Sequence, residues 1–397
     1  MNRRNFIKRG LAAAAGLGMA PALFTRTAHA AGGNGKILVV FHLFGGNDAI
    51  NNVIPYTQSE YYDYRPDISI PTDKIITLDA PGVKVGLHPV LKPLMDDFWQ
   101  HGELAIINQV GYPNHNRSHF YSSAIWASAD PDQISKQGWI GSFVDEQNDP
   151  FCATSLGSAL PRALRGLHTS GLSINHIEEF TIKNKAARDE LVRQIGTPRS
   201  GLAEETRKAM DHMMRSISKM EEARQSRYKP STKFPRGYYG MRFSDISRLI
   251  KFNFDSQVYY VYVGGWDTHA GQGGAQGTHA NVLKQIAQSM AAFRTEMKLQ
   301  GRWDDVMIMV FSEFGRRAMQ NASKGTDHGK GGVLYVAGGG VKGGLYGGEP
   351  SLQEEDLDEG DLPIKIDFRT VYAAAAQHIG ANPADLVGPN FGPIDII

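Results

Sequence analysis

The chain has 397 residues, with 42 basic and 41 acidic side chains, and hydrophobic residues make up 41% of it. The formal charge of +1 gives no electrostatic argument for nucleic-acid binding, and the length suffices for one large domain or two small ones. Cys152 is the single cysteine. An intrachain disulfide is therefore excluded, and a hydrophobic core must stabilise the fold.

The first 30 residues have the pattern of an export signal. Arg3 and Arg4 precede a mildly apolar, glycine-broken stretch, and Ala28-His29-Ala30 offers small residues for cleavage. Paired arginines are typical of twin-arginine signals, and the apolar stretch is too short to form a stable membrane span. We expect the twin-arginine export machinery to deliver the folded chain to a periplasmic or extracellular location, with cleavage near Ala30. The alternative is a basic, disordered tail.

From residue 36 to about 141, short apolar runs alternate with helix-like stretches. The runs at 37–41 and 104–107 predict buried strands, and the apolar spacing over 88–99 predicts a helix. This alternation is typical of βαβ units.

Residues 178–235 differ from the rest because they are charged, rich in helix-forming residues and free of strand-like runs. A set of apolar side chains falls on one helical face: Met210, Met213, Met214, Ile217 and Met220. We expect this face to pack against the body of the protein. The segment predicts a helical insertion or cap within a domain that spans residues 31–397, and it is the candidate surface for an exported protein partner.

The α/β pattern then resumes. Strand-like runs occur at 258–263, 306–311 and 333–337, and helices are expected at 279–299 and 368–379. Strands that alternate with helices favour an α/β fold with a mostly parallel central sheet flanked by helices.

Carboxylates and imidazoles adjoin four of the apolar runs. They follow a strand or, for the last pair, precede one: Asp48, Asp267 with His269, Glu313, and Asp327 with His328. Because ligands collect beyond the carboxyl ends of strands in an open α/β sheet, these residues are candidates for a shared metal site. The mixture of ligand types favours zinc, with manganese or iron as alternatives, whereas an all-oxygen shell would favour calcium or magnesium. Taken singly, each aspartate is better explained as an Asx turn or a helix cap.

The loop after the run at 104–107 supplies a candidate nucleophile. Ser118 stands at an expected helix start, where the helix N-terminus favours an anion, between Arg117 and His119. These three form the candidate catalytic set, in which the Ser118 hydroxyl would attack an ester while Arg117 holds its phosphate or sulfate group. The alternative is that Ser118 is a helix N-cap.

Several motifs together resemble the exported family known as domain of unknown function 1501, over essentially the whole mature chain. The motifs are Phe44-Gly45-Gly46-Asn47-Asp48, Gly111-Tyr112-Pro113-Asn114 with Arg117-Ser118-His119-Phe120, Gly265-Trp266-Asp267-Thr268-His269, Phe311-Ser312-Glu313-Phe314-Gly315-Arg316-Arg317, and Thr326-Asp327-His328-Gly329. That family is similar in turn to the alkaline phosphatase and sulfatase superfamily. The resemblance implies a three-layer alkaline-phosphatase-like fold with one or two divalent metals at the carboxyl end of the sheet.

The resemblance also implies two ligand sets. One metal would be held by Asp267, His269 and His328, and a second by Asp48, Glu313 and Ser118. The chain departs from the superfamily pattern at Phe314, which stands where a histidine is usual. The second metal then lacks a ligand unless another side chain supplies it, and the candidates are His115, His119 and Asp327. The sulfatase nucleophile motif is absent, which argues against classical sulfatase activity.

Two functions fit these features. The first is an exported metal-dependent hydrolase of phosphate, phosphonate or sulfate esters that acts on an anionic small molecule. The second is a non-catalytic, metal-binding periplasmic partner protein that keeps the fold without turnover. A metal-free serine esterase is disfavoured because the chain lacks a Gly-x-Ser-x-Gly elbow.

Overall fold

A computed structural model describes residues 34–397 except 80–81, 133–134, 180–184, 198–199 and 226–227, so the expected export signal lies outside the described residues. The strands are β1 (Ile37–Leu43), β2 (Val53–Ile54), β3 (Ile76–Thr77), β4 (Gly86–Leu87), β5 (Leu104–Gly111), β6 (Ala153–Leu156), β7 (Leu172–Ile174), β8 (Val258–Val263), β9 (Val306–Ser312), β10 (Gly332–Gly338), β11 (Gly344–Tyr346) and β12 (Ile366–Asp367). The α-helices are α2 (Ala49–Asn52), α3 (Ser59–Tyr64), α4 (Lys92–Asp97), α5 (His119–Ser128), α6 (Trp139–Gln147), α7 (Lys185–Ile195), α8 (Leu202–Gln225), α9 (Tyr238–Lys251), α10 (Thr278–Leu299), α11 (Phe368–His378) and α12 (Pro383–Val387).

The central sheet is mostly parallel, as the sequence predicts. Within the described residues it has nine strands in the order β11-β5-β10-β9-β1-β8-β6-β7, with β12 paired to β5. Only β10 runs antiparallel to its described neighbours, β5 and β9. The carboxyl ends of β1, β5, β8 and β9 therefore lie at one edge of the sheet, together with the start of β10.

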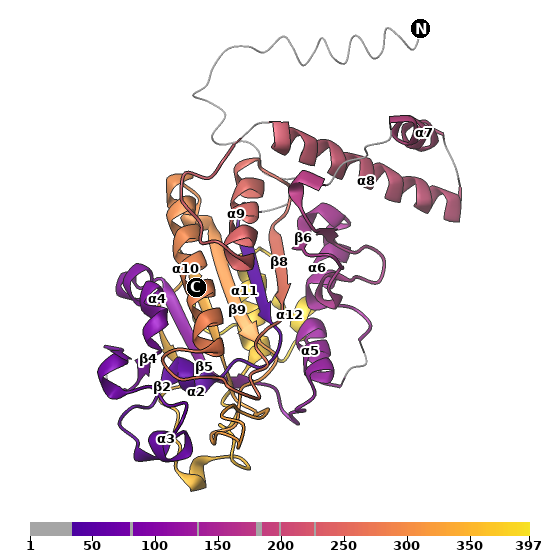
Figure 1. Ribbon diagram of the computed structural model, residues 1–397. Coiled ribbons are helices and arrows are strands. Elements are labelled where there is room, and N and C mark those ends of the chain that lie inside the picture. The colour runs from indigo at the N-terminus through magenta and orange to yellow at the C-terminus, as the bar shows by residue number, and fades with distance from the viewer. Residues whose placement is uncertain (1–33, 80–81, 133–134, 180–184, 198–199, 226–227) are drawn as a thin grey trace.

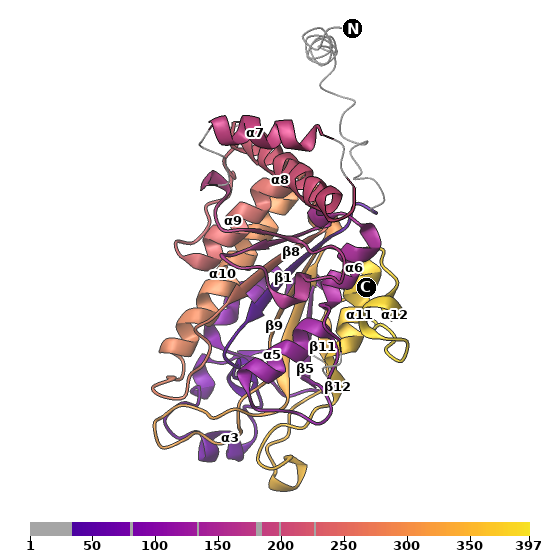
Figure 2. The same ribbon diagram turned by 90° about the vertical axis from the view of Figure 1, so that its right-hand side faces the viewer.

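Helices cover both faces of the sheet, which gives the three-layer arrangement (Figures 1 and 2). Side chains of α4, α9 and α10 belong to one hydrophobic core, and those of α5, α6, α11 and α12 belong to the other. Strand β1 serves both cores, because Val39 and Phe41 enter the first and Leu38 and Val40 enter the second. A strand buried on both faces needs an unbroken apolar run.

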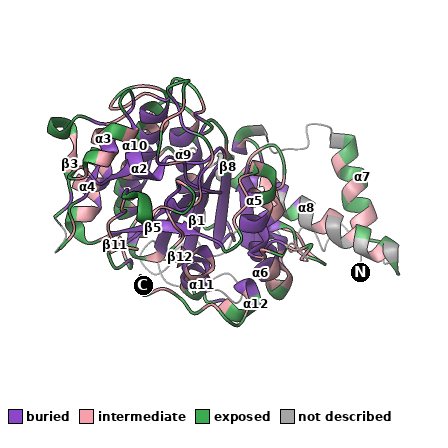
Figure 3. Cartoon of the chain, turned by 90° about the horizontal axis from the view of Figure 1, so that it is seen from below, coloured by how far each residue is buried: buried purple, intermediate pink, exposed green. Residues whose placement is uncertain are grey.

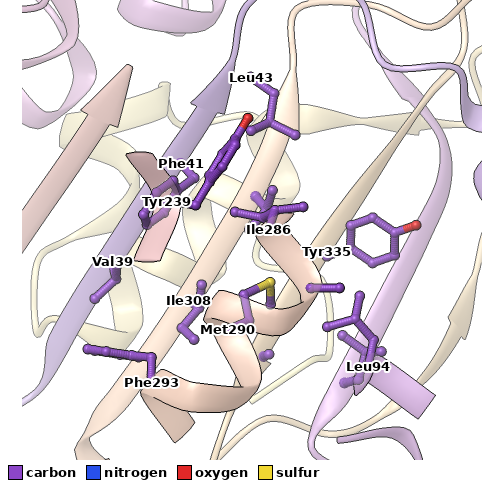
Figure 4. Close-up of a cluster of buried hydrophobic side chains, with 14 of the residues drawn as sticks. Val39, Phe41, Leu43, Leu94, Tyr239, Ile286, Met290, Phe293, Ile308 and Tyr335 are labelled. Atoms are coloured by element: carbon purple, nitrogen blue, oxygen red, sulfur yellow. The ribbon is translucent and has the colours of Figure 1, made fainter. Parts of the chain in front are cut away.

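Figure 4 shows the first core, where Val39, Phe41 and Leu43 of β1 face Met290 and Phe293 of α10. In Figure 3 the central strands are coloured as buried, and exposed residues lie on the outer helices and loops. The core therefore fixes the strands rigidly and leaves the loops at their ends to form the site.

The long predicted strands and helices are confirmed, and one shorter helix differs. The expected helix over 88–99 is a 3-10 turn, η2 (Pro89–Leu91), followed by the short α4. Pro93 lacks the backbone N–H that would bond to the carbonyl of Pro89, so the two pieces do not form one continuous α-helix.

Residues 178–235 contain α7 and α8, which lie at the top of the molecule in Figure 1, whereas the loops between β9 and β10 lie at the bottom. Met214, Ile217 and Met220 of α8 are buried, and Met220 belongs to the first core. The side chain of Met213 lies outside what is described. Among the described residues, none of the helices has the length and apolar character that crossing a bilayer requires.

Candidate metal centre

Loops from β1, β8, β9 and β10 are held together at the edge of the sheet. Gly315 N donates to Lys330 O at 3.1 Å, and Gly329 N donates to Gly315 O at 2.9 Å, so the pairing of β9 with β10 continues beyond the sheet. Gly45 has φ of +133°, and a Cβ there would lie 2.3 Å from the backbone nitrogen of Asp267. Only glycine allows the loop after β1 to approach the loop after β8 this closely.

Four side chains from three segments converge at this edge: the start of α5, the loop after β8 and the loop between β9 and β10. One ligand atom from each of His119, Asp267, His269 and His328 lies within 4.8 Å of all the others. His269 Nε2 is 2.7 Å from His328 Nε2 and 3.1 Å from Asp267 Oδ1. Asp267 Oδ2 is 3.4 Å from His119 Nε2, and Asp267 Oδ1 is 3.6 Å from His328 Nε2. We call these four residues the His–Asp cluster.

An acceptor holds the other ring nitrogen of each histidine. The pairs are His119 Nδ1 with Glu313 Oε1 at 2.7 Å, His269 Nδ1 with Asp327 Oδ1 at 3.1 Å, and His328 Nδ1 with the carbonyl oxygen of Arg117 at 2.7 Å. Because carboxylates and carbonyls only accept, each Nδ1 carries a proton. In the neutral imidazoles, the Nε2 atoms then bear the lone pairs, and these atoms form the cluster.

This donor set fits a divalent cation. His269 Nε2 and His328 Nε2 face each other at 2.7 Å, which is repulsive between two lone pairs unless a proton or cation lies between them. His119 Nε2 is buried and has no hydrogen-bond partner among the residues that the structure describes. Atoms bonded to zinc at about 2.0–2.2 Å stand roughly 3.3 Å apart in a tetrahedron. The four pair distances given above, 2.7–3.6 Å, lie on either side of that value, and all the ligand atoms lie within 4.8 Å of one another.

Arg316 ties the cluster to the surrounding loops. Its buried guanidinium lies 2.6 Å from Asp267 Oδ1 and donates to the carbonyl oxygens of Gly46 at 2.9 Å and Thr326 at 2.6 Å. Burial acts to raise the pKa of Asp267, but the hydrogen bond and charge of Arg316, together with His269 and His119, outweigh burial, and the pKa is lowered. Burial also lowers the pKa of His328. Both groups are therefore kept in the protonation state that binds a metal.

Glu313 supports the cluster and is not a member of it. Its carboxylate accepts from His119 Nδ1 at 2.7 Å, from the backbone nitrogen of Gly45 at 2.9 Å and from the Ser312 hydroxyl at 2.8 Å. Burial acts to raise the pKa of Glu313, but the hydrogen bonds from His119 and Ser312 and the neighbouring His42 together outweigh burial, and the pKa is lowered. A carboxylate behind a histidine is the usual arrangement for fixing the tautomer of a metal ligand.

Asp48 is not brought to the cluster. Its carboxylate lies 2.7 and 3.1 Å from the guanidinium of Arg65 and 2.5 Å from Gln272 Nε2, and it also caps α2 through the backbone nitrogen of Asn51. Burial acts to raise the pKa of Asp48, but the charge and hydrogen bonds of Arg65, together with His279 and Gln272, outweigh burial, and the pKa is lowered. The buried guanidinium thus occupies the carboxylate. The second ligand set that the resemblance implies is not assembled.

The three candidate catalytic residues have different surroundings. His119 belongs to the cluster, while Ser118 is an exposed residue at the N-cap of α5 whose side chain makes no cap hydrogen bond within the described helix. The guanidinium of Arg117 forms an ion pair with Asp361, and its backbone carbonyl accepts from His328. The predicted ligand Asp327 lies behind His269 as its hydrogen-bond partner.

A cleft of 820 Å³ adjoins the cluster at Arg117, which lines the cleft and whose backbone carbonyl accepts from His328. Arg117, Lys330 and Asp358 contribute to its lining, which among the described residues includes none of the four cluster members. The volume is in the range of small-molecule sites.

Two features of the site were not anticipated from the sequence. The sequence pattern places His119 in the catalytic set and among the possible replacement ligands, whereas the structure brings it into the cluster. The support of His119 by Glu313 joins residues 194 positions apart in the chain. A histidine that begins a helix beyond a strand is the signal that could have indicated that His119 lies in the cluster.

Comparison with solved structures shows distant similarity. The C-terminal periplasmic domain of EcEptC from Escherichia coli, in complex with Zn, has 9% identity and a TM-score of 0.41 over 90% of this chain and 88% of that chain. A protein in the alkaline phosphatase superfamily from Vibrio parahaemolyticus has 10% identity and a TM-score of 0.39 over 89% and 68%. Alkaline phosphatase from the Antarctic bacterium TAB5 has 10% identity and a TM-score of 0.31 over 78% and 94%.

No match to the chain is found among curated proteins. The structural similarities are too weak to carry a functional argument, which must come from the geometry of the cluster. A family model described as "Protein of unknown function (DUF1501)" matches residues 35–392, and the chain belongs to this family, as its motifs predict.

Proposed function

We propose that the protein is a metal-dependent hydrolase of phosphate, phosphonate or sulfate esters. The observation that supports this best is the His–Asp cluster, where three imidazole nitrogens and one carboxylate converge. The motifs that resemble the alkaline phosphatase and sulfatase superfamily add support. Imidazole-rich donor sets favour zinc over manganese, iron or calcium.

The cluster would hold one metal ion. Asp267 and the three histidines would be its ligands, and Asp48 would not, because Arg65 engages its carboxylate. When bound, the metal would supply a Lewis acid that stabilises negative charge developing on the ester oxygens. Glu313 would fix the tautomer of His119, and Arg316 would keep Asp267 ionised.

Ser118 is the proposed nucleophile because its hydroxyl is exposed, adjoins His119 and stands at a helix N-terminus that favours an anion. Its Oγ would form a bond to phosphorus or sulfur while the bond to the leaving oxygen breaks, and the proton lost by Ser118 balances the proton gained by the leaving alcohol. Water would then cleave the covalent ester, restore the hydroxyl and release the acid anion. Arg117 would bind the substrate anion by exchanging Asp361 for it.

We also propose twin-arginine export to the periplasm or beyond, with removal of the signal near Ala30. Arg3, Arg4 and the small residues around Ala30 support it. Replacing both arginines by lysine should leave the precursor in the cytoplasm. Normal export of that double variant would refute this part of the proposal.

A non-catalytic metal-binding protein is the second candidate. Two ion pairs favour this candidate. Arg117 is paired with Asp361 and so is not free to bind a substrate anion. Asp48 is paired with Arg65 and so is not free to bind a second metal. The metal would then stabilise the three segments that supply its ligands.

Elemental analysis, together with assays on an aryl phosphate and an aryl sulfate, tests both candidates. The hydrolase predicts about one metal ion per chain and turnover that disappears, with the metal, in His328→Ala. The exposed His168 offers a matched control, since His168→Ala should retain both the bound metal and the turnover. Bound metal without turnover would support the second candidate, and absence of metal would refute both.

A further inference from the structure

Three aromatic side chains form a surface that begins at the His–Asp cluster. Phe44 follows β1, Phe120 lies in the first turn of α5, and Tyr262 lies near the end of β8. The ring centroid of Phe44 is 5.2 Å from that of His119, 5.4 Å from that of Tyr262 and 6.3 Å from that of Phe120. We call Phe44, Phe120 and Tyr262 the aromatic ledge.

Two of the three side chains of the ledge are exposed to solvent and are not used to pack the core. Phe120 is 84% exposed and Tyr262 is 41% exposed, although the first four residues of β8 are buried. Phenylalanine is also a weaker helix former than alanine or leucine, so α5 gains nothing locally from Phe120. Exposed aromatic residues that gather at one place mark binding surfaces.

The position of the ledge indicates what covers it. The ring of Phe44 lies against both the imidazole of His119 and the ring of Phe120, so the ledge is continuous with the cluster. Figure 1 shows α5 beside the end of the sheet to which β8 points. The short distances between the rings place the ledge at the same end of the sheet. A group attached to an anion at the cluster would therefore lie across the exposed rings.

We infer that the substrate is an aryl ester whose aromatic ring stacks on the aromatic ledge while its anionic group meets the His–Asp cluster. This inference rests on the proposed function and specifies its substrate class. Stacked aromatic pairs with centroids 4.5–7 Å apart are favourable beyond the area that they bury. Phe120 acts here as a specificity residue for the leaving group, and the cluster recognises the anion.

Calorimetric binding of two phosphonates to the metal-loaded protein tests the inference without turnover. Phenylphosphonate and methylphosphonate carry the same anion and differ in the ring. We expect phenylphosphonate to bind about 2- to 10-fold more tightly, and cyclohexylphosphonate, which is apolar but cannot stack, to gain less. In Phe120→Ala the ratio of the phenyl and methyl affinities should fall toward one.

Leu299 provides the matched control, since it is 65% exposed and ends α10, away from the helix start that faces the site. Leu299→Ala should keep the wild-type ratio. A wild-type ratio of one, or a ratio that Phe120→Ala leaves unchanged, would overturn the role of the ledge and leave the hydrolase proposal standing. If neither methylphosphonate nor phenylphosphonate binds, both proposals fail.

Discussion

Replacing Glu313 by glutamine measures how far the metal affinity depends on support behind a ligand. Glu313 accepts from three donors, on His119, Gly45 and Ser312, at 2.7–2.9 Å. Glutamine has the size of glutamate but is uncharged and carries an NH₂ group in place of one carboxylate oxygen. This NH₂ group would face one of the groups that donate to Glu313, so two hydrogen-bond donors would oppose each other. Loss of such a supporting carboxylate weakens metal binding about 10- to 100-fold, which corresponds to about 1.4–2.7 kcal/mol.

The assay is competition between metal-free protein and a zinc chelator, with circular dichroism to check the fold. Glu103→Gln is the matched control, because Glu103 also accepts charged hydrogen bonds, from Arg294 and Lys298, but precedes β5 at the far end of the sheet. It should leave the zinc affinity unchanged. A folded Glu313→Gln protein with wild-type zinc affinity would refute the supporting role.

Three further changes have distinct expected outcomes. Asp48→Asn should lower the free energy of unfolding, measured in urea, by about 3–5 kcal/mol, because it leaves the buried guanidinium of Arg65 without its counter-charge. The folded fraction of this variant should still bind zinc. Loss of zinc without loss of stability would instead make Asp48 a metal ligand. Ser118→Ala should change stability by less than about 0.5 kcal/mol and keep zinc but abolish ester turnover, and retained turnover would exclude Ser118 as the nucleophile. Burial lowers the pKa of His279 to about 3, so below pH 6.5 the unfolded chain binds a proton that the folded chain does not. From this residue, stability should fall by up to about 1.4 kcal/mol per unit of decreasing pH, and urea unfolding of His279→Gln should show a shallower slope; an equal slope would contradict the assignment.

The long strands could be predicted because burial on both faces leaves an uninterrupted apolar run, as in β8 and β9. The positions of Asp267, His269 and His328 beside strand ends likewise indicated that they would meet. Asp48 has the same relation to β1, but its direction is set by Arg65, which lies 17 positions away on another element. The end of a strand determines where a residue lies but not which neighbour its side chain binds. The ion pair between Asp48 and Arg65 could therefore not be predicted from the sequence.

The order in which the chain is synthesised determines when the sheet and the cluster can assemble. The His–Asp cluster draws its members from positions 119 to 328, and β10, which joins β5 to β9, emerges from the ribosome after all of them. Until β10 pairs, β5 and β9 expose strand edges that attract other chains. Such long-range pairing is slow, so the four donors meet only when the chain is nearly complete. The metal ions available where the chain folds are therefore the first ones that the assembled cluster encounters.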